Sequence, residues 1–275
     1  MRKRLLPALA LCLALLLTAC GAEPDAAVSA TGAAVSAAGE PAVSAPAETA
    51  PEPAPAPEPA PPPQPGRVVV LDPGHSASVS GETEPIGPGA DEMKAADAIG
   101  TRGVVTGTME YELTLAVAQQ LAEELSARGY TVLLTRQDNS TAVSCAERAR
   151  MAGDARADAF IRIHADGAAS STAGGATAIC TSPDNPYHPE LYERSRRLSD
   201  CLLNAYCSAT GMASRGVVEE DNMTGNNWST VPVTLIELGF MTNPDEDRRM
   251  AEADFRQLMV QGLADGIDDY LQGIS

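Results

Sequence analysis

From residue 67 onward, short apolar segments that suit β-strands alternate with longer segments that suit amphipathic helices. The first strand is almost entirely apolar, as expected of a strand buried on both faces. Helices of this length between strands imply βαβ crossovers and a largely parallel sheet. We therefore predict one α/β domain with helices flanking the sheet. The predicted strands cover 67–72, 130–135, 158–163, 175–180 and 231–236, and the predicted helices cover 110–127, 142–153, 189–209 and 254–271.

One long irregular segment interrupts this alternation. Residues 76–108 are rich in Gly, Pro and acidic residues and show neither a strand nor a helix pattern. A loop of this length inside a compact domain is usually functional. The loop starts directly after His75 and ends just before Glu110, and both are candidate site residues because each stands at the edge of a predicted strand or helix. We therefore expect the loop to form a wall or lid of a substrate groove. The sequence leaves open whether it is instead autoinhibitory.

The N-terminus has the features of an export signal. Three basic residues, at positions 2–4, precede an apolar run over 5–17, which is shorter than a typical membrane-spanning helix. The run ends in Leu17-Thr18-Ala19-Cys20, which resembles the lipobox of bacterial lipoproteins. We expect residues 1–19 to be a lipoprotein signal peptide and Cys20 to be the lipidated residue. The alternative is an ordinary signal peptide with a chance cysteine.

Residues 20–66 have the composition of a linker. The stretch 21–65 holds twelve Pro and six acidic residues but no basic residue. Such a segment buries too little apolar surface to fold. Its Pro-rich end, 51–65, favours polyproline II and gives a stiff spacer of about 45 Å. We expect residues 67–275 to form the folded domain, which is long enough to bury a core.

The net charge limits the kinds of partner that the chain can bind. The chain carries a net charge of −18, and most of this charge falls on 67–275. An acidic surface argues against nucleic-acid binding, and it leaves the lipid as the means of membrane attachment.

Four further cysteines could form two disulfides in an exported protein, although free buried thiols are favoured. These are Cys145, Cys180, Cys201 and Cys207, of which the last two lie too far apart on one predicted helix to pair.

Four polar residues stand at the edges of predicted elements. His75 and His164 each close a strand, Glu110 opens a helix on the stripe that faces the core, and Glu237 closes another strand. Strand ends are where α/β sheets bind ligands. Two His and one Glu suit zinc, and a further Glu supplies a proton carrier. Glu237 is either a fourth ligand or a general base, and the pattern indicates a metallohydrolase.

Two other polar residues carry weaker signals. His188 lies in a turn-rich stretch before a helix, and we interpret it as a surface residue. Arg215, in Ser214-Arg215-Gly216, is either an ordinary loop residue or an anchor for an acidic group of the substrate.

Four motifs together resemble the zinc-dependent N-acetylmuramoyl-L-alanine amidases of the amidase_3 type. They are Val70–His75, Glu110–Ala118, Ala157–Ala165 and Thr234–Asn243, and they occur in the order of that family. Two departures are a longer loop between the first two motifs and Arg162 where Ser is frequent. These two differences affect which substrate the resemblance predicts to be preferred, and they leave the predicted reaction unchanged.

The resemblance implies roles for the four polar residues. It makes His75, Glu110 and His164 the zinc ligands and Glu237 the catalytic acid. It also implies a mixed six-stranded sheet and cleavage of the peptidoglycan bond between N-acetylmuramic acid and L-alanine. We expect a monomer outside the cytoplasm, anchored by lipid to the membrane and facing the cell wall. The alternatives are a zinc peptidase acting on the stem peptide and a catalytically silent wall-binding lipoprotein.

Overall fold

The computed structural model of the chain describes residues 66–273. The predicted signal peptide, Cys20 and nearly all of the predicted linker lie outside these residues. In the part that is described, no helix combines the length and the apolar character that a membrane span requires.

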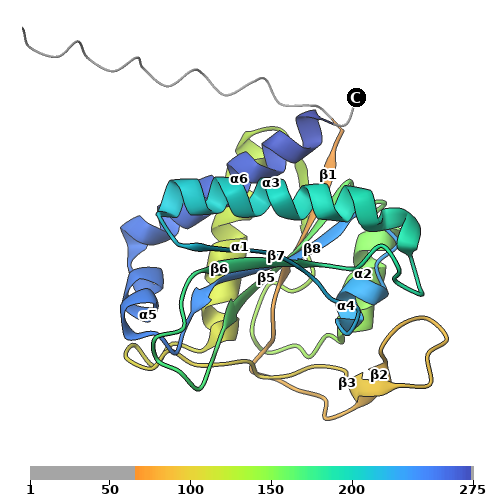
Figure 1. The fold of residues 1–275 in the computed structure, drawn as a ribbon, viewed down its shortest axis with the longest axis horizontal. Helices are drawn as coiled ribbons and strands as arrows, with labels where there is room; N and C mark the ends of the chain where they lie inside the picture. The colour runs from red at the N-terminus through yellow and green to blue at the C-terminus, as the bar shows by residue number, and fades with distance from the viewer. Residues whose placement is uncertain (1–65, 274–275) are drawn as a thin grey trace, which may run out of the picture. The chain divides into compact units, whose positions relative to one another are not determined.

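A six-stranded sheet forms the centre of the domain (Figure 1). Its spatial order is β4-β1-β5-β8-β6-β7. The first four strands run parallel to one another, β6 runs antiparallel to β8, and β7 runs parallel to β6. The predicted mixed, largely parallel sheet is confirmed. The strands are β1 (Val68–Pro73), β4 (Thr131–Leu134), β5 (Ala159–Asp166), β6 (Ala176–Cys180), β7 (Ser214–Glu219) and β8 (Val233–Phe240).

Helices cover the two faces of the sheet unequally (Figure 1). The long helices α1, α3 and α6 pack on one face and enclose the larger hydrophobic core. The short helices α2 and α4 lie on the other face, over a smaller core. The helices are α1 (Glu110–Ala127), α2 (Cys145–Asp154), α3 (Tyr192–Thr210), α4 (Thr224–Asn227), α5 (Pro244–Ala251) and α6 (Ala253–Gln272), with a 3₁₀ turn η1 (Pro189–Leu191) before α3.

Strand alternation decides which side chains reach the smaller-core face. Along β5, Ile161 and Ile163 belong to the larger core, whereas Phe160 belongs to the smaller one. Because successive side chains in a strand point to opposite faces, His164 shares the face of Phe160. Glu237 shares the face of Val233, which lies in the smaller core. Both polar residues therefore lie on the face that the short helices leave partly open.

Several predicted boundaries were wrong. β5 continues to Asp166 and β8 to Phe240, so His164 and Glu237 lie inside their strands instead of closing them. The edge strand β7 was missed because its exposed side chains give no buried stripe. The predicted closing helix at 254–271 is confirmed as α6, whereas the separate helix α5 before it was not predicted.

The segment 76–108 is more ordered than the sequence indicated. It contains a short hairpin of β2 (Thr83–Pro85) and β3 (Met93–Ala95). The hairpin is held against the small helices, because Trp228 Nε1 donates to the Pro85 carbonyl at 2.8 Å and Glu84 accepts from the Ala146 amide at 3.0 Å. The segment is therefore a fixed part of the small-helix side of the domain. The four cysteines in the described region are free.

Candidate functional site

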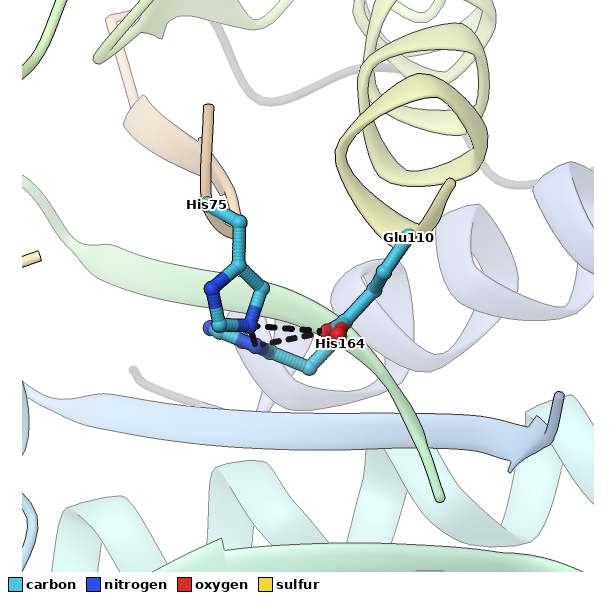
Figure 2. A group of neighbouring side chains, drawn as sticks. All are labelled: His75, Glu110 and His164. Atoms are coloured by element: carbon cyan, nitrogen blue, oxygen red, sulfur yellow. Dashed lines mark hydrogen bonds and ion pairs between the residues drawn. The ribbon is translucent and has the colours of Figure 1, made fainter. Parts of the chain in front are cut away.

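Three side chains from three distant segments converge beside the sheet (Figure 2). His75 follows β1, Glu110 is the first residue of α1, and His164 lies on β5. His75 Nε2 and His164 Nδ1 are 3.2 Å apart, and each lies 3.1 Å from Glu110 Oε1. The structure thus brings together the three residues that the sequence singled out as metal ligands.

The turn after β1 gives His75 an unusual backbone. Its φ is 64°, in the left-handed region that residues other than Gly seldom adopt. Two arginines fix this turn by hydrogen bonds to its carbonyls. Arg148 donates to Pro73 O at 2.7 Å and to His75 O at 3.1 Å, and Arg136 donates to Gly74 O at 2.9 Å. The surrounding structure therefore holds the imidazole in place at the cost of local strain.

The segment 76–108 orients two of the three side chains. Its Ala98 carbonyl accepts from His75 Nδ1 at 2.9 Å, which leaves a lone pair on Nε2. Its Thr101 amide donates to Glu110 Oε2 at 2.9 Å. Such outer contacts fix the tautomer and direction of metal-binding side chains. The segment thus contacts the site directly, in addition to forming a wall beside it.

Burial and charge set the protonation of the cluster. Burial lowers the pKa of His164 to about 4, so its ring is neutral at pH 7. Burial alone would raise the pKa of Glu110, but its contacts with His164 and His75 outweigh this and hold the pKa below the usual range. Glu110 also accepts hydrogen bonds from the amides of Thr101 and Ala165. Neutral imidazoles and an ionised carboxylate are the forms that bind a metal.

The spacing of the three atoms fits a small divalent ion. Ligand atoms at about 2.0–2.2 Å from a tetrahedral zinc lie roughly 3.3 Å from one another. The observed separations of 3.1–3.2 Å are close to that value. The Nε2 atom of His164 is buried without a hydrogen-bond partner. His75, Glu110 and His164 therefore form a candidate metal site, and in the described residues it is the one such group found.

Glu237 lies next to this group but outside it. It pairs with His164 across the β5–β8 ladder. Burial, together with the nearby charges of Glu110 and Asp166, raises the pKa of Glu237 well above its usual value. Its Oε2 atom is buried and has no hydrogen-bond partner in the described region. A carboxyl group of this kind, beside a metal site, suits proton transfer.

The residue at position 162, where the chain departs from the resemblance, has a structural partner. Arg162 is buried and its Nε lies 3.1 Å from Asp72 Oδ2. It lines a cavity of about 110 Å³ next to His75 and His164, together with Arg148 and Cys145. The cavity is not predictable from the sequence, because its lining comes from four separate segments.

The two weaker candidates fall in different places. His188, which was predicted to lie at the surface, is half-buried, and its Nδ1 lies 3.1 Å from Glu190 Oε1. Arg215 lies on β7 and lines an open groove of about 340 Å³ together with Glu237.

Comparison with known proteins places this arrangement in a family. The family Amidase_3, described as N-acetylmuramoyl-L-alanine amidase, matches residues 69–269. The chain belongs to the Amidase_3 family. The match covers nearly all of the described domain and includes every residue of the candidate site.

Similar proteins are named as a probable cell wall amidase or as N-acetylmuramoyl-L-alanine amidases. The Probable cell wall amidase LytH of Staphylococcus aureus is 29% identical over 205 residues, which are 74% of this chain and 58% of that protein. The chain thus spans 58% of the length of that curated relative. The amidase Ami1 of Mycobacterium smegmatis superposes with a TM-score of 0.70 at 26% identity, covering 76% of this chain and 98% of that one. The amidase of Clostridium difficile 630 gives a TM-score of 0.63 at 25% identity, with coverages of 76% and 98%.

A glycine in the long segment tests how closely this Amidase_3 site is packed. Gly100 has φ +84°, and a Cβ there would lie 2.5 Å from Glu110 Oε2 and 2.7 Å from the His75 ring. We predict that Gly100→Ala weakens Zn²⁺ binding about 10- to 100-fold, the usual cost of disturbing outer contacts. Calorimetric titration of the metal-free protein with Zn²⁺ measures this.

Gly89→Ala is the matched control. Gly89 lies in the same segment with φ +76°, but a Cβ there meets nothing within 4 Å. Both substitutions carry the same kind of backbone strain, and only one touches the site. Equal Zn²⁺ affinities in the two variants would show that Gly100 does not constrain the cluster.

Proposed function

We propose that this Amidase_3 protein is a zinc-dependent hydrolase that cleaves the amide bond between N-acetylmuramic acid and L-alanine in peptidoglycan. The observation that carries the proposal is the convergence of three metal-binding atoms, 3.1–3.2 Å apart, beside a buried carboxyl group. The family match supports the amide bond as the target.

The proposed metal ligands are His75, Glu110 and His164. Zinc held by them would supply Lewis acidity, which polarises a carbonyl group and activates a water molecule. The chain contributes the rigid placement of the three side chains by Ala98 O, Thr101 N and the turn after β1. Three protein ligands leave room for a substrate, as catalytic zinc sites require.

Glu237 is the proposed proton carrier. Burial raises its pKa well above that of an ordinary glutamate, which makes the carboxylate a stronger base towards water. It takes a proton from the attacking water and passes it to the nitrogen of the leaving alanine. Its position outside the three-atom group favours this role over that of a fourth ligand.

The two alternative functions gain less support. A catalytically silent protein would be expected to lack part of the constellation, yet all four side chains are present and brought together. A zinc peptidase acting on the stem peptide would use the same ligands, and the family match favours the amidase reaction over it.

Metal content tests the ligand set. We predict about one zinc per purified domain 66–275, and a sharp loss of zinc in His164→Ala because one of three protein ligands is removed. His188→Ala is the control, since that histidine is not part of the three-residue group. Elemental analysis of the parent protein and the two variants measures the zinc content of each. Full zinc occupancy in His164→Ala would exclude that residue as a ligand.

Product analysis tests the reaction and the role of Glu237 together. Digestion of purified peptidoglycan should release stem peptides with a free alanine amine, identified by mass spectrometry. We predict that Glu237→Gln keeps its zinc and loses activity roughly 10²- to 10⁴-fold, the usual worth of a general acid or base. Cleavage inside the stem peptide would identify a peptidase instead. Lost zinc would make Glu237 a ligand, and a near-normal rate would place the proton carrier elsewhere.

We also propose that the protein is tethered outside the cytoplasm through a lipid on Cys20, followed by the linker 20–66. The lipobox-like sequence at 17–20 supports this. In a bacterial host, Cys20→Ala should leave the membrane fraction, whereas Cys12→Ala, a change within the predicted signal, should stay with it. Retention of Cys20→Ala in the membrane at the parent level would mean that the attachment lies elsewhere.

A further inference from the structure

The groove beside Glu237 has a second end, formed by the edge strand β7. The groove is lined by Asp166, Thr177, Ile179, Arg215, Val218, Glu220, Met223 and Glu237. Among these described lining residues, Arg215 is the single cation, against three acidic side chains. The groove therefore offers one place at which an anionic group of a ligand is attracted and not repelled.

Arg215 lies in line with the proposed reaction centre. In the sheet, His164 pairs with Glu237 and Glu237 pairs with Thr177. Opposite Thr177, β7 carries two residues, Arg215 and Gly216, because the β6–β7 register shifts there. One row across four strands thus leads from a metal-site residue to Arg215. Arg215 lies two strands beyond Glu237, so the two backbones are roughly 10 Å apart.

The irregularity in β7 is a β-bulge, a device that redirects side chains next to active sites. Gly216 has φ +87°, which the bulge accommodates. Gly175, on the neighbouring strand end, has φ +98°, and a Cβ there would meet Ala213 O at 2.5 Å and Arg215 Cγ at 3.2 Å. The glycine thus lets the backbone beside Arg215 pack closely, with the arginine stem lying against it.

Two contacts hold Arg215 while leaving most of its donors free. Its guanidinium lies over the Phe240 ring, 5.1 Å from the centroid, and Nη1 donates to Gly174 O at 3.3 Å. Glu246 ties these supports together by accepting from the amides of Gly175 and Phe240, each at 2.7 Å. Among the residues that the structure describes, no acidic side chain forms an ion pair with Arg215.

We propose that Arg215 binds a free carboxylate on the peptide side of the substrate, two residues beyond the scissile bond. This inference rests on the proposed amidase function. On the sugar side, the lactyl carboxyl group is consumed in the scissile amide. On the peptide side, an extended chain advances about 3.5 Å per residue, so the second residue reaches roughly 7 Å towards Arg215. In peptidoglycan that residue is D-glutamate joined through its γ-carboxyl, and its α-carboxyl is either free or amidated.

A matched pair of substrates tests this subsite. The two are muramyl peptides that differ only in whether the α-carboxyl of the second residue is free or amidated. We expect the parent protein to favour the free acid about tenfold in kcat/KM, through KM, because a hydrogen bond to a charged group is lost in the amide. Arg215→Ala should remove this preference. Its zinc content and its kcat/KM on the amidated substrate should stay unchanged. Arg215→Lys should retain part of it, and Arg248→Ala, which removes an exposed arginine on α5, should retain all of it.

Binding of short peptides separates this subsite from catalysis. The γ-carboxyl of the second residue is amidated in both peptides, as a stand-in for its link to the next residue. L-alanyl-D-glutamine, with a free α-carboxyl, should bind more tightly than its α-amide by calorimetry, and the difference should vanish in Arg215→Ala even if the protein cleaves no peptidoglycan. A preference for the acid that depends on Arg215 supports the subsite whichever bond the enzyme hydrolyses. Equal binding of these two γ-amidated peptides by the parent protein, or equal losses on both substrates in Arg215→Ala, would overturn the proposal.

Discussion

The buried carboxylate of Asp72 is the interaction on which the site depends. Arg148 and Arg162 contact its two oxygens at 2.8 and 3.1 Å, and Thr135 donates to it at 2.6 Å. Burial alone would raise the pKa of Asp72, but the two guanidinium charges outweigh this and hold the pKa well below its usual range. Removing the carboxylate would leave two buried arginines without their counter-charge, a strongly destabilising change.

The ion pair between Arg148 and Asp72 also fixes the geometry of the turn after β1. Arg148 contacts both Asp72 and the carbonyls of Pro73 and His75. The left-handed backbone of His75 is thereby tied to a buried ion-pair network of one carboxylate and two guanidinium groups. Ion pairs of this kind add little net stability but specify one arrangement. Here that arrangement directs the His75 imidazole towards Glu110 and His164.

Much of the site was predictable because its side chains follow strong local patterns. His75, Glu110 and His164 lie next to or within apolar strands and at a helix start, where the periodicity of 2 or 3.6 residues is clear. The contacts from Ala98 and Thr101 were not predictable, since backbone groups leave no trace in the residue pattern. The edge strand β7 was missed for a related reason: half-exposed strands lack a buried stripe, and pairing with β6 decides their existence.

The change of strand direction between β8 and β6 explains why one edge of the sheet collects so many polar groups. β1, β5 and β8 run parallel, and their carboxyl ends carry His75, His164 and Glu237. β6 and β7 run the opposite way, so their amino ends, with Thr177 and Arg215 each second in its strand, meet the same edge. Ligands in open α/β sheets bind where the strand order reverses. In this domain the change of direction also extends the row of polar residues past the candidate metal site, so the peptide substrate that we propose would meet groups of both charges in a fixed order.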